Sequence, residues 1–99
     1  MDVKAQRRHY MLKKYGLTEE TYRQKLMDQH HQCAICQDSH VPGERRFAVD
    51  HNHRTRRTRG LLCLRCNLIL GAASDNVQVL MDAITYLKHW QRQGRGQRG

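Results

Sequence analysis

The feature that most constrains this chain is a pair of Cys-x-x-Cys motifs, Cys33–Cys36 and Cys63–Cys66, which contain all four of its cysteines. Thiolates from two such motifs can close a tetrahedral site around one zinc ion. A zinc ion bound to four sulfurs has no open position for a substrate, so the predicted role of this site is structural. The alternative interpretations are two redox-active pairs or four unrelated thiols.

Chain length favours the zinc interpretation. The sequence has 99 residues, of which 38% are hydrophobic, enough for one small domain with a thin core. Domains of this size commonly need a bound metal or another cross-link to be well ordered. We expect one domain over residues 1–90, followed by a disordered tail at 91–99 that contains only Gln, Arg and Gly.

The charge balance points to a phosphate-bearing partner. There are 18 Lys and Arg residues against 9 Asp and Glu residues, a formal net charge of +9, which is typical of chains that meet nucleic acid or an anionic membrane. No apolar run approaches the ~20 residues of a membrane-spanning helix. The N-terminus lacks the apolar stretch of a secretory signal. We therefore expect a cytoplasmic protein without a membrane partner, in a compartment where paired cysteines more often hold metal than form disulfides.

Two helices are expected before the first cysteine pair. Helix-forming residues at 4–15 end at Gly16, a suitable residue after a helix C-terminus. A second helix is expected at 19–29, with Thr18 as its N-cap and two glutamates in its first turn. The expected buried stripe of this helix contains Tyr22, Leu26 and Met27.

A β-hairpin and a short helix are expected next. The hairpin pairs a strand at 46–51 with one at 57–62 through a turn around 54–56, and the helix covers 66–72. A final helix is expected to run to about Trp90, with Ser74 or Asp75 as its N-cap. Its three- and four-residue apolar spacing predicts a core-facing stripe of Val77, Leu80, Met81, Ile84 and Leu87.

The segment between the cysteine pairs carries groups suited to phosphodiester hydrolysis. Its 26 residues, 37–62, exceed what a compact zinc ribbon needs and contain Asp50, His51 and His53. An imidazole can be neutral and basic near pH 7, so His51 is a candidate general base. The carboxylate of Asp50 suits Mg²⁺ or Mn²⁺, and Asn67 can supply a second oxygen ligand from a helix that the zinc holds in place.

Each of these residues also has an alternative explanation. Asp50 and His51 are neighbours in a strand, so they converge on one phosphate only if the strand ends or is distorted there. Otherwise they form a surface hydrogen bond. Asn67 could act as a helix cap, and His53 could be a supporting residue, a phosphate contact or an ordinary surface residue.

A cluster of arginines surrounds this segment with a single acid, Asp50, among them. We expect the cluster to bind a nucleic-acid backbone with little sequence information, and the alternative is a solvated turn. Its members are Arg45, Arg46, Arg54, Arg56, Arg57 and Arg59.

With these motifs in place, the chain resembles the phage recombination endonuclease VII family, within the HNH or ββα-metal nucleases. The motifs that carry the resemblance are CAIC at 33–36 and VDHNHRTRRTRGLLCLRCNLILG at 49–71, with YGLTEETYRQKL at 15–26 and LMDAITYL at 80–87 as less specific ones. The similarity covers roughly residues 15–87. It implies a small α+β fold, in which a zinc-stapled ββα-metal motif at about 46–72 is flanked by N- and C-terminal helices.

The resemblance also implies residue roles that agree with the chemistry above. Asp50 and Asn67 would bind the catalytic Mg²⁺ or Mn²⁺, His51 would be the general base, and His53 would support the active site. The four cysteines would hold structural zinc. By motif, Arg59 is the best placed arginine to contact the phosphate oxyanion. Gln37 and Arg56 depart from the family pattern, which has glycine at both positions, where a positive φ is often required.

The expected function is hydrolysis of DNA phosphodiester bonds to 5′-phosphate and 3′-hydroxyl ends with weak sequence preference. Duplex, nicked or branched DNA would be the substrate, inside a phage host cell or the bacterial cytoplasm, and the enzyme would be a monomer or a small homodimer. The competing hypothesis is a non-catalytic zinc-ribbon module that only binds DNA or RNA.

Overall fold

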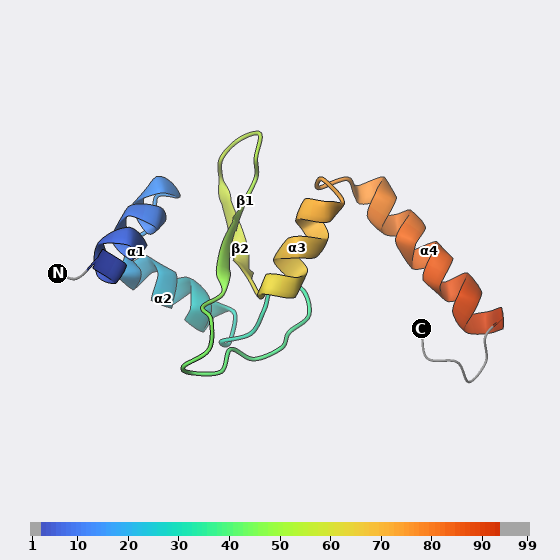
Figure 1. Ribbon diagram of the computed structural model, residues 1–99, viewed down its shortest axis with the longest axis horizontal. Coiled ribbons are helices and arrows are strands. Elements are labelled where there is room, and N and C mark those ends of the chain that lie inside the picture. Colours follow the sequence, from blue (N-terminus) through green and yellow to red (C-terminus); the bar gives the residue numbers. More distant parts are fainter. Residues whose placement is uncertain (1–2, 94–99) are drawn as a thin grey trace. The chain divides into compact units, whose positions relative to one another are not determined.

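The computed structural model describes residues 3–93, which form four helices and one two-stranded sheet (Figure 1). In chain order the elements are α1 (Val3–Lys14), α2 (Glu19–Asp28), β1 (Ala48–His51), β2 (Thr58–Leu62), α3 (Leu64–Ala72) and α4 (Val77–Gln93). This is the small α+β class expected from the sequence. The chain divides into two compact units, Met1–Asn67 and Leu68–Gly99, and each is described by itself.

The end of α1 has the hydrogen bonds of a Schellman motif. Gly16 adopts φ +74°, its N–H donates to the carbonyl of Lys13 at 2.9 Å, and the Leu17 N–H donates to the carbonyl of Leu12 at 2.8 Å. Leu12 and Leu17 are both buried, as is usual for the two apolar residues of this motif. The predicted stop at Gly16 is confirmed, and Tyr15 takes the C-cap position.

Helix α2 begins where predicted and packs its side chains around one tyrosine. Thr18 is the N-cap and forms a reciprocal capping box with Thr21. Tyr22 is buried, its hydroxyl donates to the carbonyl of Phe47 at 2.7 Å, and burial raises its pKa. The predicted stripe is wrong at Met27, which is 58% exposed, because the buried face of this short helix is only wide enough for Tyr22 and half-buried Leu26.

Strands β1 and β2 form an antiparallel hairpin with one irregularity. Ala48 pairs with Leu62 and Val49 with Leu61, but His51 pairs with Thr58. Two steps along β1 therefore correspond to three along β2, which is the count of a β-bulge. The extra residue belongs to β2, where Arg59 and Gly60 lie opposite Asp50, and β1 itself ends at His51. Asp50 and His51 thus lie at the end of a strand, one of the two conditions under which neighbouring strand residues could converge.

The predicted turn is confirmed and is organised by Asn52. The Asn52 side-chain oxygen accepts hydrogen bonds from the N–H groups of Arg54 and Thr55 at 2.8 and 3.0 Å, which is the Asx-turn arrangement. Arg56 follows with φ +64°. Gln37, after the first cysteine pair, has φ +61°. Both departures from the family glycine therefore lie at left-handed positions.

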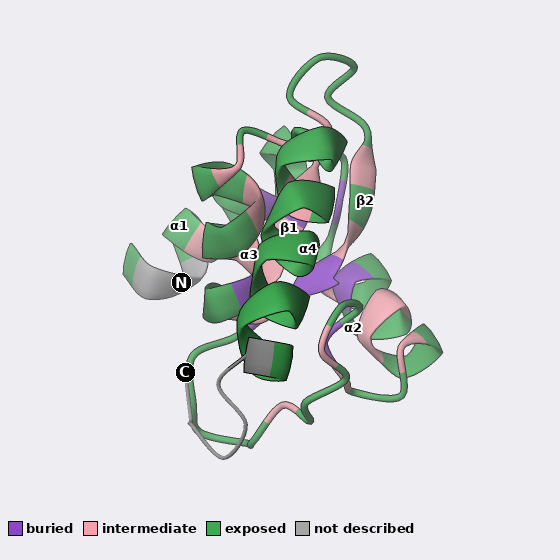
Figure 2. Cartoon of the chain, turned by 90° about the vertical axis from the view of Figure 1, so that its right-hand side faces the viewer, coloured by how far each residue is buried: buried purple, intermediate pink, exposed green. Residues whose placement is uncertain are grey.

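The core of the first unit is small, as the composition indicated. Its buried apolar side chains outside the cysteines are Leu12, Leu17, Tyr22, Phe47, Leu61 and Leu62. Figure 2 colours the buried parts of the chain purple. Gln29, next after α2, binds the β2 backbone through both ends of its amide, since its Oε1 accepts from the Leu61 N–H at 2.8 Å and its Nε2 donates to the Leu61 carbonyl at 3.0 Å. The Gln29 side chain thus supplies hydrogen-bond partners for the N–H and the carbonyl of Leu61 on the edge of β2.

Two predictions for the second unit are wrong. The N-cap of α4 is Asn76, whose side-chain oxygen accepts from the Val79 N–H at 3.2 Å. Ser74 and Asp75 have φ +52° and +57° and lie in the turn that ends α3, so neither can cap α4. The apolar stripe predicted to be core is also largely exposed, with Val77 68%, Met81 54%, Ile84 53% and Leu87 56% exposed.

Helix α4 extends beyond the predicted end at Trp90. Residues 91–93 belong to the helix rather than to a disordered tail, because Gln and Arg are good helix formers. The rest of the predicted tail, 94–99, lies outside the described residues. Within 3–93, no helix combines the length and the apolar character needed to cross a membrane. One domain over 1–90 stays a prediction.

The positive φ of Gln37 generates a stability prediction. Replacing Gln37 by Gly should raise the free energy of unfolding by about 0.5–1 kcal/mol, because glycine lacks the Cβ that disfavours the left-handed conformation. Urea denaturation of the zinc-loaded protein would measure the change. Gln37→Ala keeps a Cβ and should not raise the free energy of unfolding. A Gln37→Gly protein that is less stable than wild type would contradict the proposed backbone strain at Gln37.

Candidate functional site

The four cysteines converge into one cluster. The Sγ atoms of Cys33, Cys36, Cys63 and Cys66 all lie within 4.8 Å of one another, and those of Cys36 and Cys63 are 3.8 Å apart. Four sulfurs placed tetrahedrally at 2.3 Å from zinc are separated by about 3.8 Å. The predicted grouping is confirmed, and the cluster has the dimensions of a zinc–tetrathiolate site.

Electrostatics within the cluster also suit a metal. Burial raises the pKa of the Cys33 thiol, but backbone N–H groups of Cys36, Cys63 and Ile35 directed at its sulfur outweigh this and lower the pKa to about 6. Burial and the three neighbouring sulfurs raise the pKa of Cys66 to about 12. Without metal, therefore, the site is partly protonated at neutral pH, and zinc must displace protons in order to bind.

The second cysteine pair forms the start of α3. The helix begins at Leu64, two residues before the predicted start at Cys66, because the Cys63 carbonyl already accepts the Asn67 N–H at 3.0 Å. Asn67 consequently lies in the first turn of α3, next to a buried cysteine of the cluster. The cysteine cluster thus adjoins the helix start that carries Asn67, and a zinc ion bound there would hold that start in place.

The carboxylate of Asp50 is buried and paired. Asp50 is 8% exposed, and Arg59 binds it with two hydrogen bonds, from Nε to Oδ2 at 2.6 Å and from Nη2 to Oδ1 at 2.9 Å. This is the bidentate geometry of a strong arginine–carboxylate pair. Each oxygen keeps a lone pair that could coordinate a cation, so the pairing is compatible with the predicted metal role.

The imidazole of His51 contacts two other rings. Its centroid lies 4.6 Å from that of Tyr15 and 4.5 Å from that of His53. The rings of His51 and His53 are thus in contact, with His51 half-buried and His53 exposed, and the role of His53 stays a prediction. No hydrogen bond within residues 3–93 joins Asn67 to Asp50 or to His51. Tyr15 had no predicted role, because its contact with His51 spans 36 positions of sequence and leaves no local pattern.

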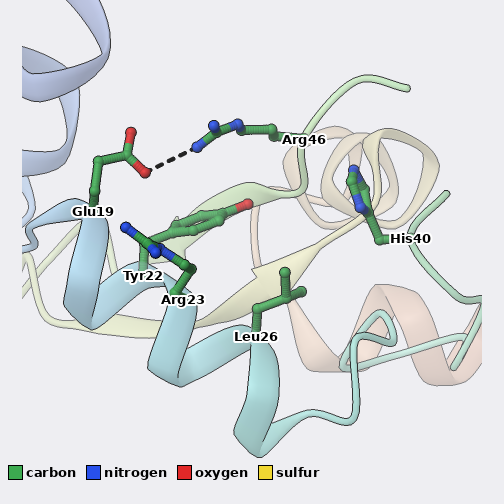
Figure 3. Close-up of a pocket in the computed structure, with 6 residues that line it drawn as sticks. All are labelled: Glu19, Tyr22, Arg23, Leu26, His40 and Arg46. Atoms are coloured by element: carbon green, nitrogen blue, oxygen red, sulfur yellow. Dashed lines mark hydrogen bonds and ion pairs between the residues drawn. The ribbon is translucent and has the colours of Figure 1, made fainter. Parts of the chain in front are cut away.

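The predicted arginines differ in the contacts that they make. Arg54, Arg56 and Arg57 are exposed in and beside the hairpin turn, whereas Arg59 faces Asp50. Arg46 binds Glu19 at 2.9 Å, at a cavity of about 390 Å³ between α2 and the segment before β1 (Figure 3).

That cavity is separate from the predicted chemistry. Its lining residues are Glu19, Tyr22, Arg23, Leu26, His40 and Arg46, which include none of the residues predicted to bind metal or act as base. Glu19 is already shared between two guanidinium groups, since Arg8 also binds it at 2.9 Å. The cavity is therefore not the candidate active site.

Comparison with known proteins identifies the family. The recombination endonuclease VII profile matches residues 8–89. The chain belongs to that family. Among curated proteins, the chain is similar to the Gene 59 proteins of Mycobacterium phages D29, at 45% identity over 80 residues, and L5, at 41% over 78 residues. These alignments cover 79% and 78% of this chain but only 47% of each relative, so this family member spans about half their length.

A solved structure supports the same fold. The crystal structure of the ββα-Me type II restriction endonuclease Hpy99I matches with a TM-score of 0.55 and 32% identity, over 71% of this chain and 41% of the other. The hairpin followed by α3 corresponds to the ββα motif expected from the resemblance to endonuclease VII. The predicted fold class is thereby confirmed.

Metal removal should unfold the Met1–Asn67 unit. Structural zinc contributes an apparent 10–16 kcal/mol in small zinc domains, about as much as the total stability of a small protein. A chelator at neutral pH, or Cys63→Ser, should therefore abolish the cooperative thermal transition measured by circular dichroism. Zinc should restore it after chelation, Mg²⁺ should not, and the zinc affinity should fall as the pH is lowered. An unchanged transition in zinc-free protein would refute the structural role.

The Asp50–Arg59 pair should stabilise the hairpin. Arg59→Gln leaves a nearly buried carboxylate without its bidentate partner and should cost about 2 kcal/mol, between the values for exposed and fully buried ion pairs. Urea denaturation of zinc-loaded Arg59→Gln, Asp50→Asn and the double variant would give the coupling energy. Additive losses in the double variant would contradict a direct pair.

Proposed function

We propose that this chain is an HNH-type, metal-dependent endonuclease that hydrolyses DNA phosphodiester bonds. The observation that carries the proposal is the end of β1, opposite the bulge in β2, where buried Asp50 and half-buried His51 adjoin in a chain of the endonuclease VII family. The ββα-Me restriction endonuclease that this chain resembles supports the same reaction class.

His51 is the proposed general base. It would take a proton from the water that attacks phosphorus in line with the departing 3′ oxygen, leaving 5′-phosphate and 3′-hydroxyl ends. A base must lie within hydrogen-bonding reach of the proton it removes. His51 is at the end of β1 beside an exposed turn, so water and a DNA strand can approach it from solvent. His53, in contact with its ring, is the proposed supporting residue.

Asp50 and Asn67 are the proposed ligands of the catalytic Mg²⁺ or Mn²⁺. Both offer hard oxygen atoms, which these ions prefer. When bound, the cation would supply charge neutralisation at the reacting phosphate. Arg59 orients the Asp50 carboxylate through its two hydrogen bonds, which limits the movement of this ligand.

The arginines of the hairpin turn are the proposed DNA contacts. Arg54, Arg56 and Arg57 are exposed, and the Asn52-centred turn holds the backbone of the segment. Contacts of this kind are made to backbone phosphates, so binding should be salt-sensitive and should carry little sequence information. Duplex, nicked and branched DNA therefore remain the proposed substrates.

Cleavage of a supercoiled plasmid tests the function. Wild-type protein with Mg²⁺ or Mn²⁺ should convert the plasmid to nicked or linear forms, and His51→Ala should cut about 10²–10⁴-fold more slowly, as expected when a general base is lost. Asn67→Ala should lose cleavage with an unchanged thermal transition. His9→Ala is the matched control, because His9 is exposed on α1, and it should cut like wild type.

Two results would reject parts of this proposal. Equal cleavage by His51→Ala and wild type would remove the base assignment. Gel shifts without product under either metal would favour the alternative, a zinc module that only binds nucleic acid.

A further inference from the structure

We propose that Tyr15 is a positioning residue for His51, holding the imidazole ring in the orientation in which it accepts a proton. The inference rests on the proposed function, because that function makes His51 the general base. It adds a residue from the end of α1, outside the ββα motif, to the machinery of the site.

The rings are in direct contact. The centroids of Tyr15 and His51 lie 4.6 Å apart with an interplanar angle of 33°, within the range of favourable aromatic pairs. Rotation about χ2 of histidine has broad minima, so packing rather than an intrinsic preference determines where the ring nitrogens point. The tyrosine ring supplies such packing and lies against the imidazole.

Tyr15 is itself held firmly. It is the C-cap residue of α1, between Leu12, which is 1% exposed, and Leu17, which is 8% exposed. The hydrogen bonds from the Gly16 and Leu17 N–H groups back to α1 fix the backbone on its C-terminal side. A ring carried on such a turn can restrain its neighbour.

A second contact joins Tyr15 to the strand opposite His51. The Thr58 hydroxyl donates to the Tyr15 carbonyl at 2.9 Å, and Thr58 is the residue that pairs with His51 across the hairpin. The three residues thus form a closed arrangement, in which the tyrosine backbone is bound to β2 while its ring packs on a residue of β1.

His53 is less suited to this role. Its ring also touches His51, at 4.5 Å and 51°, but the residue is exposed in the hairpin turn. No hydrogen bond of its side chain to another residue of 3–93 holds it in place. Tyr15 is therefore the anchored contact of the imidazole.

Steady-state cleavage by position-15 variants tests the proposal. Tyr15→Leu should lower kcat roughly 10- to 100-fold with KM nearly unchanged, because a misdirected base affects the chemical step more than DNA binding. Tyr15→Phe keeps the ring and should retain wild-type kcat. Tyr10→Leu is the matched control, since Tyr10 is on the same helix but is 80% exposed, and it should also retain kcat.

A spectroscopic measurement separates positioning from folding and from the proposed function. By NMR, the carbon-bound ring protons of His51 should show a ring-current shift that is kept in Tyr15→Phe and lost in Tyr15→Leu, whether or not the protein cuts DNA. Thr58→Val keeps the tyrosine ring but removes the hydrogen bond from the Thr58 hydroxyl to the Tyr15 carbonyl. It should lower kcat by a smaller factor than Tyr15→Leu does.

Three outcomes would overturn the proposal. They are wild-type kcat in Tyr15→Leu, a change confined to KM, and unaltered His51 resonances in that variant. If wild type cuts nothing while the resonances change as expected, the proposed function fails and the ring contact stands without a catalytic role.

Discussion

The structure depends on the convergence of four cysteine sulfurs. Cys33 and Cys36 follow α2, Cys63 and Cys66 begin α3, and the sulfurs of all four lie within 4.8 Å. The apolar core of this unit contains few side chains, which is expected for so short a chain. Coordination of one metal by these sulfurs would therefore replace much of the hydrophobic burial that a larger domain uses, and it would join the two ends of the hairpin-bearing segment.

This junction also determines how the candidate site is supported. The Cys63 N–H points to the sulfur of Cys33 at 3.4 Å, and the Ala34 N–H donates to the Leu61 carbonyl at 3.1 Å, so the first cysteine pair is bound directly to the end of β2. On the same strand, Gln29 binds the backbone of Leu61 and Arg59 binds Asp50. Strand β2 thus links the cysteine cluster to the Asp50 carboxylate, and rigid elements of this kind can hold reacting groups within narrow tolerances.

Sequence patterns predicted the parts of the molecule that are encoded locally. The helix stop at Gly16, the Thr18 cap, the hairpin and the cysteine grouping each follow from a few neighbouring residues. The contacts of Tyr15 with His51, Arg59 with Asp50 and Gln29 with Leu61 join residues far apart or across a bulge, where no periodicity marks them. The stripe of α4 shows the limit of periodicity, since an apolar face identifies an amphipathic helix but does not specify what covers it.

Gln37 and Arg56 are two of the six non-glycine residues with positive φ in the described chain, and they differ in what their side chains contribute. Glycine would adopt φ near +60° with less strain than Gln37 or Arg56. The exposed side chain of Gln37 has no role in the proposed reaction. Nothing in that reaction therefore offsets the cost of its left-handed backbone. At position 56 the side chain adds a cation to an exposed turn that already carries Arg54 and Arg57. Strained backbone often persists at functional sites, and this hairpin turn carries three of the arginines proposed to contact DNA.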